Sequence, residues 1–458
     1  METVGNALNA WATFMWSTPL VVLLVGGGVF FVLHSRGMPY RYFRHGIEIL
    51  SGKFDKDAGA AGDITHFKAL ATALSGTLGL GNITGVAVAI TVGGPGAIFW
   101  MWVTAVVGVA TKFYTASLAV MYRGKDDSGH LQGGPMYVIR EALPRRWLPL
   151  AYLFAIAGLF GTLPVFQVNQ LVQVLRDVFA IPAGLASSEQ HLAFDFLTGL
   201  ILSAVVFAVV IGRIQRIAAV TSRVVPFMVV FYFVLTAALL FVHADAIPAA
   251  FAMIFEGAFR GQSVAGGALG TVILIGVQRG AFSNEAGIGT EALAHGAART
   301  KEPIREGVVA MIGPVVDTLI VCTCTALAIL VTGVWQGDAV GASITTLAFE
   351  TTFPRIGSYL LLIMVFFLSM STVLTFSYYG AKCAGFLFGT RFETLYIWFY
   401  VALITLGAVV SLRAVIGLLD GMYATMAIPT MISSLLLAPK VRAAALDYFG
   451  RLKEGTRL

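Results

Sequence analysis

The stretch SGTLGLGNITG, residues 75–85, interrupts a hydrophobic span with glycines and polar side chains, and GVQRGAFSNEAG, residues 276–287, interrupts another. Lipid offers no hydrogen bonds, so a non-helical segment at membrane depth is stable only where protein or a water-filled cavity receives its backbone groups. Two glycine-interrupted spans in corresponding halves of a chain are typical of secondary transporters and point to the binding site. Both stretches therefore predict discontinuous helices around a central site.

The composition is that of a membrane protein. Hydrophobic residues make up 58% of the 458 residues and charged residues 12%, against roughly 45–50% apolar and 25% charged in an average soluble domain. Apolar spans follow one another almost end to end, which predicts one integral membrane domain over residues 1–458, with lipid as a partner. The first 15 residues contain no Lys or Arg, so we expect no cleaved signal peptide.

Eleven apolar spans of about 20 residues predict an all-α polytopic bundle. They lie near residues 14–33, 68–91, 97–121, 148–178, 194–212, 220–242, 263–296, 305–333, 356–380, 394–411 and 415–438. The first span is an extra helix. The next five, residues 68–242, form one repeat, and the last five, residues 263–438, form a second repeat that runs in the opposite direction. Each repeat opens with an interrupted helix, and residues 439–458 form a tail.

Basic residues predict the orientation of the spans. Arg and Lys gather in the loops after the first, third, fifth, seventh and ninth spans and after the last, whereas the alternate loops carry only Arg176, Arg260, Arg355 and Arg413. Short cytoplasmic loops hold the excess of Lys and Arg. The amino terminus is therefore expected outside the cell and the carboxyl-terminal tail in the cytoplasm. This topology accounts for the pI near 9.2, so no nucleic-acid partner is expected.

The two breaks also predict the kind of ligand. A helix interrupted at mid-membrane presents free N–H groups on one side and free carbonyl groups on the other. The N–H groups near Asn82, Ile83 and Thr84 suit a carboxylate, and carbonyls near Thr77 and Leu78 suit Na⁺ or an ammonium group. A zwitterionic amino acid with a co-transported cation needs both kinds of surface in one pocket. The alternative is that the glycines only let helices pack closely.

Several motifs resemble the alanine or glycine:cation symporter family between about residues 60 and 440. They are GTLGLGNITG (76–85), GGPG (93–96), GGPMY (133–137), RGAFSNEAG (279–287), PVVDT (314–318) and SYYG (377–380). The resemblance implies a LeuT-type fold in a bacterial or archaeal inner membrane, and uptake of a small neutral amino acid such as alanine or glycine with Na⁺ or, less often, H⁺. The LGLGN run is also similar to the first helix break of neurotransmitter:sodium symporters, whose carbonyls and Asn amide ligate Na⁺.

Three polar residues on later spans are candidate cation ligands, together with Thr77, Leu78 and Asn82. Asp317 lies 12 residues beyond Arg305, about 18 Å into the eighth span. A carboxylate at that depth costs several kcal/mol unless a cation or strong hydrogen bonds receive it; the alternative is that it holds a helix break open. Ser371 and Thr372 match the family's hydroxyl pair opposite the first break, which implies a Na⁺ site, although such hydroxyls often bond only their own helix.

The substrate-binding candidates come from four spans. They are Thr77, Gly81, Asn82, Ile83 and Thr84 at the first break, Gln170 on the fourth span, Gly276, Val277 and Gln278 at the second break, and Phe376 on the ninth span. An amide offers both donor and acceptor, and we favour Gln170 over Gln167 on the same face of the helix. Family members often carry Trp and Glu where Phe376 and Ala381 stand here. Substrate size is therefore open, with serine, cysteine or glutamine as larger alternatives.

Lys112, Arg279 and Glu285 are predicted to act as gates or scaffold. H⁺ coupling through Lys112 is an alternative to Na⁺, because a lysine ammonium can substitute for the cation in some LeuT-type transporters. No His-rich metal spacing, activated nucleophile or phosphate loop is present, so neither an enzyme nor a transition-metal site is expected. No span carries the continuous polar stripe of a channel. We expect a monomer with no cofactor besides the coupling ion; an uncoupled permease is the remaining alternative.

Overall fold

The computed structural model describes residues 2–53, 60–259, 268–337, 339, 341–410 and 413–454, and these residues are mostly helical. The predicted spans correspond to α1 (Glu2–Met15) with α2 (Thr18–His34); α5 (His66–Thr77), η1 (Leu80–Asn82) and α6 (Thr84–Gly93); α7 (Ala97–Met121); α9 (Leu148–Gly161), α10 (Val165–Leu175) and η3 (Arg176–Ala180); α11 (Leu192–Val210); α12 (Arg213–Val242); α14 (Ala268–Asn284) and α15 (Glu291–His295); α16 (Pro303–Ala310), α17 (Ile312–Pro314), η5 (Val315–Cys322) and α18 (Thr323–Thr332); α20 (Gly357–Phe388); α21 (Arg391–Val409); and α22 (Arg413–Lys453).

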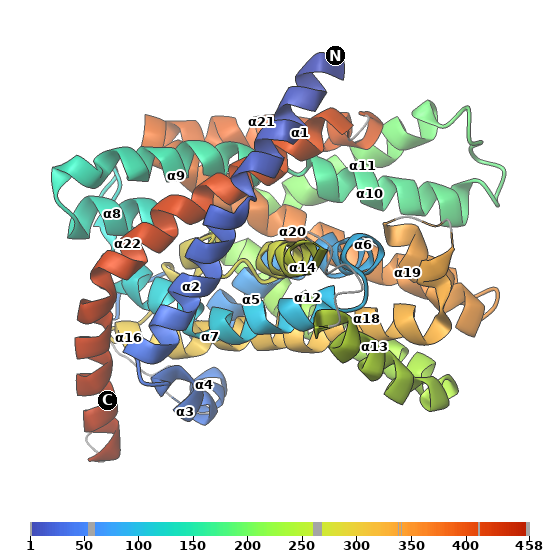
Figure 1. Cartoon of the computed structure of the whole chain (residues 1–458). Helices are drawn as coiled ribbons and strands as arrows, with labels where there is room; N and C mark the ends of the chain where they lie inside the picture. The colour runs from blue at the N-terminus through green and yellow to red at the C-terminus, as the bar shows by residue number, and fades with distance from the viewer. Residues whose placement is uncertain are drawn as a thin grey trace.

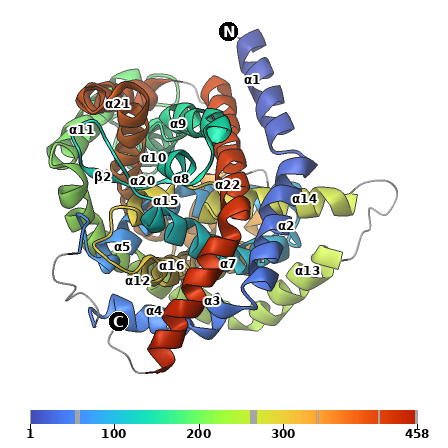
Figure 2. The same cartoon turned by 90° about the vertical axis from the view of Figure 1, so that its left-hand side faces the viewer.

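Shorter elements connect the spans. They are α3 (Met38–Arg41), α4 (Phe43–Leu50), the antiparallel hairpin of β1 (Gly124–Lys125) and β2 (Leu131–Gln132), α8 (Pro135–Ala142), η2 (Arg145–Trp147), η4 (Ala244–Ala246), α13 (Ile247–Phe259), η6 (Val334–Gln336) and α19 (Ala342–Thr352). In Figure 1, α11, α21 and α10 lie along one another, and α5, α6 and α14 occupy the middle of the molecule. Figure 2 shows the end that bears β2, α8, α15, α16 and the start of α5, which we call the basic face because the Arg- and Lys-rich loops connect there.

The helices agree with the predicted all-α polytopic fold. Among the described residues, nine helices are long and apolar enough to cross a membrane, and a bent pair of helices makes a tenth. The one predicted span that is not among these ten, the seventh at 263–296, corresponds to α14 and α15, although residues 263–267 lie outside the described part of the chain. The division into two inverted repeats stays a prediction.

The first predicted break is present. Helix α5 ends at Thr77, and α6 continues at 59° to it after one 3-10 turn. Gly79 makes this path possible by its lack of a side chain: a Cβ there would lie 2.7 Å from Thr372 Oγ1 and 3.2 Å from Gln167 Nε2. The backbone of the break therefore touches α20 and α10 directly, closer than any side chain would permit.

The second break lies later in the chain than the glycines at 276 and 280 suggest. Helix α14 runs without interruption to Asn284, and the chain then turns through Glu285, Gly287 and Gly289, all at positive φ, before α15 begins. Gly276 sits inside α14, where a Cβ would lie 2.5 Å from Ala97 O of α7. This glycine allows α14 and α7 to pack closely. The second break is therefore confined to residues 285–290, between the end of α14 and the start of α15.

Two further irregularities were not predicted. The fourth span is divided at residues 162–164, ahead of Val165, because Pro164 has no backbone N–H for a helical bond. The eighth span contains a π-helical segment, η5, which includes Asp317. Such segments widen a helix locally and occur often at functional sites.

The extra first helix and the last helix pack closely. A Cβ at Gly421 of α22 would lie 2.3 Å from the Trp11 ring of α1. Trp16 Nε1 donates a hydrogen bond to Asp420 O at 3.0 Å. Helix α22 also continues past Pro439 to Lys453, through most of the predicted tail. Tyr448 there hydrogen-bonds His45 at 2.7 Å, so this segment is packed onto the protein.

Candidate functional site

Oxygen atoms from α5 and α20 meet at the first break. Thr372 Oγ1 lies 3.0 Å from Ser75 O, 3.0 Å from Leu368 O and 3.5 Å from Leu78 O. Ser371 Oγ lies 3.0 Å from Leu368 O and 3.5 Å from Ser75 O. All of these atoms are oxygens, and both hydroxyl residues are buried. The predicted hydroxyl pair therefore faces the carbonyl end of α5, a donor set that suits a hard monovalent cation.

A second group of polar atoms surrounds Asp317 on η5. Its Oδ1 accepts a hydrogen bond from Asn82 Nδ2 at 2.7 Å, and its Oδ2 accepts bonds from Ser283 Oγ and Thr318 Oγ1, each at 2.7 Å. Asn82 Oδ1 in turn accepts from Gly79 N at 3.0 Å. Asp317 is fully buried. The carboxylate thus joins η5, the first break and the end of α14, and it is well hydrogen-bonded at a depth where an isolated charge would be costly.

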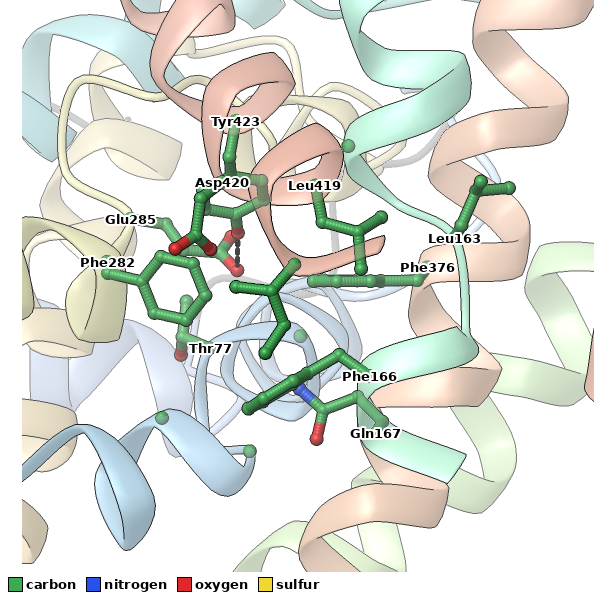
Figure 3. A pocket seen from close by; sticks show the side chains of 15 residues that line it. Thr77, Leu163, Phe166, Gln167, Phe282, Glu285, Phe376, Leu419, Asp420 and Tyr423 are labelled. Atoms are coloured by element: carbon green, nitrogen blue, oxygen red, sulfur yellow. Dashed lines mark hydrogen bonds between the residues drawn. The ribbon is translucent and has the colours of Figure 1, made fainter. Parts of the chain in front are cut away.

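A small cavity lies beside the first break (Figure 3). Its volume is about 40 Å³, and its lining residues are Gly76, Thr77, Gly79, Gly81, Gly161, Leu163, Phe166, Gln167, Phe282, Glu285, Phe376, Ile416, Leu419, Asp420 and Tyr423. One water needs roughly 10–15 Å³ by the same kind of measure, so the cavity holds only a few atoms. Three predicted substrate residues, Thr77, Gly81 and Phe376, lie on its wall.

The polar groups of the cavity are unevenly placed. In the view of Figure 3, the side chains of Glu285, Asp420 and Tyr423 lie on one side and that of Gln167 on another, with apolar rings between them. Glu285 is buried and accepts hydrogen bonds from Tyr423 OH and Thr290 Oγ1. The carboxylate side suits a positive group, and the amide side, with its N–H donors, suits a negative one.

The glutamine on the cavity wall is Gln167 and not the predicted Gln170. Gln167 lines the cavity, and its Oε1 accepts a hydrogen bond from Leu80 N at 3.2 Å. Gln170 lies away from the cavity, where its Nε2 donates to Gln173 Oε1 at 3.1 Å. Gln167 is therefore the amide on the cavity wall, and Gln170 stays a predicted substrate residue that lies outside the cavity lining. The two share a helix face, but the broken helix lies at the depth of Gln167.

Several other predicted substrate residues lie outside the cavity lining. Gly276, Val277 and Gln278 are within α14, because the second break begins only after Asn284. Ile83 and Thr84 also lie beyond the wall of the cavity. The N–H groups of Asn82 and Ile83 already donate, at 3.1 Å each, to Gly79 O and Leu80 O. The 3-10 turn thus occupies two N–H groups that we expected to be free.

The predicted gate or scaffold residues lie at three different places. Glu285 is on the cavity wall. Lys112 is buried on α7, and a Cβ at Gly313 would lie 3.3 Å from its Nζ, so it faces α17 and not the cavity. Arg279 lies on α14. Their roles stay predictions.

Sequence reasoning did not identify Asp420 and Tyr423 as site residues. Both line the cavity from α22 and are three residues apart, which places them on one helix face. An ionisable residue inside a membrane span is a functional candidate by default, and that rule, applied to Asp420, would have found this wall.

Comparisons with known proteins identify the family of the chain. The model of the sodium:alanine symporter family matches residues 1–458. The chain is 39% identical over 437 residues to the sodium/alanine symporter AgcS of Methanococcus maripaludis, covering 94% of each protein. It is 31% identical over 444 residues to the probable sodium/glutamine symporter GlnT of Bacillus subtilis, covering 96% of this chain and 90% of that protein.

A solved structure supports the fold. The structure of MhsT in complex with L-phenylalanine matches with a TM-score of 0.57 at 12% identity, covering 85% of this chain and 99% of the other. At that identity the likeness shows the fold alone, and it is the LeuT-type fold. Together with the family match, these findings establish that the chain belongs to the sodium:alanine symporter family, a family of transporters and not of enzymes.

Proposed function

We propose that this chain is a secondary active symporter that couples uptake of a small neutral amino acid, alanine or glycine, to entry of Na⁺ by alternating access. The observation that carries the proposal is the oxygen cluster at the first break, where the carbonyls of Ser75, Leu78 and Leu368 meet the hydroxyls of Ser371 and Thr372. Five oxygens from two helices, at membrane depth, offer a cation an inner coordination sphere in place of water.

The group around Asp317 supports a second cation position. Its carboxylate, Ser283 Oγ and the Asn82 amide are within hydrogen-bond distance of one another. Rotation of the Asn82 amide would bring a third oxygen toward a cation there. The position lies between the two breaks, so a bound cation would connect them.

The cavity supports a small zwitterion as substrate. Its volume of about 40 Å³ favours alanine or glycine in this conformation. We assign the ammonium group to the side of Glu285 and Asp420 and the carboxylate to Gln167. Matched variants test the second assignment: Gln167→Ala should weaken alanine binding about tenfold, since a lost hydrogen bond to a charged group is worth about 1.5–3 kcal/mol, whereas Gln170→Ala should bind as the wild type does.

Radiolabelled alanine uptake into proteoliposomes tests the coupling. An inward Na⁺ gradient should drive accumulation, and its replacement by choline at constant pH should abolish it. Uptake that is unchanged in choline would exclude Na⁺ coupling, and a requirement for a pH gradient would assign H⁺ as the coupling ion. We place the protein in a bacterial or archaeal inner membrane, with the basic face in the cytoplasm, and we expect it to act as a monomer.

A larger substrate such as glutamine is the second candidate. It is favoured by Phe376 on the cavity wall, where a Trp would leave less room, and by the similarity to the probable sodium/glutamine symporter GlnT. Competition of labelled alanine uptake by unlabelled glutamine and serine separates the two candidates.

A further inference from the structure

A cluster of buried ionisable side chains lies at the basic face, apart from the cavity. Glu306 of α16 accepts a hydrogen bond from His295 Nδ1 at 2.6 Å through one carboxylate oxygen and a very short one from His66 Nδ1 through the other. His66 begins α5 and His295 ends α15. All three residues are 0–1% exposed. One carboxylate therefore connects the basic-face halves of both broken helices to α16.

The backbone connects the same two segments. Asp63 N donates to Ala297 O at 2.9 Å and Arg299 N donates to Ile64 O at 2.7 Å, which makes a parallel bridge between Ile64 and Ala298. The guanidinium of Arg123, beyond the end of α7, donates to Gly296 O at 2.7 Å and to Ala61 O at 3.0 Å. We call His66, His295, Glu306 and Arg123 the clasp.

The position of the clasp relates it to transport. Helix α5 leads from His66 to Gly76 and Thr77 on the cavity wall, and α15 follows directly on the second break. The two helices pack against each other. Each helix has one end at a break, α5 its last residue and α15 its first. Each can therefore move without the other half of its span. A passage from the cavity to the basic face that separates α5 from α15 must release the clasp.

The chemistry of the clasp favours two states. Closed, it has two hydrogen bonds to a buried carboxylate, which are stronger than bonds between neutral groups. Closed, it also leaves His66 Nε2 and His295 Nε2 buried without a hydrogen-bond partner among the described residues. A hollow of about 840 Å³ lies on the basic face and is lined by Asp63, next to the clasp. Water from there could hydrate the two nitrogens once the segments part, which offsets the bonds lost.

We propose that Glu306 is a positioning residue that keeps α5 and α15 together while the cavity is sealed from the basic face, and that releasing its two histidines accompanies passage of the amino acid to that face. The inference rests on the proposed transport function, but its structural part does not depend on which solute is carried.

The first experiment locks the clasp. In a variant with Cys322, Cys324 and Cys383 changed to Ala, the substitutions Ile64→Cys and Ala298→Cys place a pair across the parallel bridge. Oxidation should reduce alanine uptake at least about tenfold while alanine binding to the purified protein changes less than about threefold, and reductant should restore uptake. The matched control is Lys125→Cys with Leu131→Cys across the hairpin, where oxidation should leave uptake unchanged. Full uptake by the oxidised 64–298 pair would overturn the proposal.

The second experiment loosens the clasp and needs no substrate. With Ile64→Cys alone in the same background, Glu306→Gln should raise the rate of maleimide labelling at position 64 at least about threefold, because the segments part more often. His66→Phe, which keeps a ring of similar size, is the second variant if the first does not elute as a folded species. The control is Glu302→Gln, an acid at the start of the same helix that pairs with Arg451. Equal labelling at position 64 in the parent Ile64→Cys protein and in its Glu306→Gln and His66→Phe derivatives would overturn the proposal even in a protein that carries no alanine.

Discussion

The two broken helices differ in how the break is made. Between α5 and α6 the described residues include none at positive φ, and the chain is opened by close contact of Gly79 with α20 and α10. Between α14 and α15 the chain turns through three residues at positive φ, and Glu285 there is tied to Thr290 and Tyr423. The first break depends on neighbouring helices, and the second depends on its own backbone and side chains.

The backbones of the two breaks therefore have different roles. The backbone of the first break is available to bind a ligand, and the turn of the second break supports the fold. At the first break, backbone carbonyls face the hydroxyls of Ser371 and Thr372 on α20. A cation can therefore take the place of these hydrogen bonds while both helices stay folded. At the second break, the Glu285 carboxylate already accepts two hydrogen bonds, from Thr290 and Tyr423. We therefore expect substitutions at the first break to impair transport in a stable protein. Substitutions of the glycines that turn the second break should lower stability, while the Glu285 carboxylate there still binds the ammonium group in the folded fraction.

The largest effect is expected at Gly79. Gly79→Ala would place a Cβ 2.7 Å from Thr372 Oγ1, and overpacking of this kind costs about 1–3 kcal/mol. Because the strain falls on the oxygen cluster, alanine uptake should fall by roughly 10- to 100-fold. Gly85→Ala in α6 is the matched control, since a Cβ there would meet open space and Gly85 does not line the cavity. Equal loss of uptake in both variants would contradict the assignment of the contact to Gly79.

At the second break, Gly287→Ala should destabilise the fold. Its φ is +87° and a Cβ there would lie 2.7 Å from Met431 Sδ; the left-handed conformation costs a non-glycine residue about 1–2 kcal/mol, and overpacking adds to this. Thermal unfolding in detergent should shift to lower temperature, with alanine affinity kept in the folded fraction. Gly270→Ala in α14, which has open space around it, serves as the control. A stable Gly287→Ala protein that has lost alanine binding would show that the turn at Gly287 shapes the binding site and does not only support the fold.

A smaller effect is expected for Thr372→Ala. The change removes one of the oxygens opposite the first break, so apparent Na⁺ affinity should fall about tenfold, the order of one hydrogen bond to a charged group. Alanine affinity at saturating Na⁺ should change less, because it is affected only through linkage. Ser369→Ala on the same helix should leave both affinities unchanged. The measurement is alanine binding to purified protein over a Na⁺ titration.

The smallest effect is expected from Phe376→Trp on the wall that faces the first break. A larger ring should raise the preference for glycine and alanine over serine and glutamine, and one or two methylenes in an apolar pocket are worth only about 1–3 kcal/mol. Competition of labelled alanine uptake by these four amino acids measures the change. An unaltered profile would mean that Phe376 does not face the side chain of the substrate.

Hydropathy and basic loops were sufficient to predict most of the helices. The span predicted at residues 97–121 coincides with α7, because a continuous apolar run between charged loops permits only one alignment with a bilayer. The details of the second break could not be predicted in the same way. Gly276 and Gly287 are the same residue type, but one packs against α7 and the other turns the chain, and only the neighbouring helix distinguishes these uses.

The site was predictable only in part for a similar reason. Phe376, Thr77 and Gly81, which are predicted to bind the substrate, line the cavity, since the family motifs place them beside the breaks. Gln167 and Gln170 lie on one face of α10, three residues apart in depth. The sequence around them does not reveal which of the two lies at the depth where α5 ends. Asp420 lies in α22, a helix without a break, so neither a glycine interruption nor a family motif marks its place on the cavity wall.

The close packing of α1 on α22 has a consequence for the cavity. Asp420, Leu419 and Tyr423 form one wall of it, and the backbone at Asp420 is held by Trp16. That wall is thus held by a segment that precedes both predicted repeats and does not line the cavity. We expect a chain shortened by residues 2–16, which lacks Trp16, to insert and bind Na⁺ but to leak, passing ions without amino acid. The fidelity of coupling would then depend on the mechanical support given by the first helix.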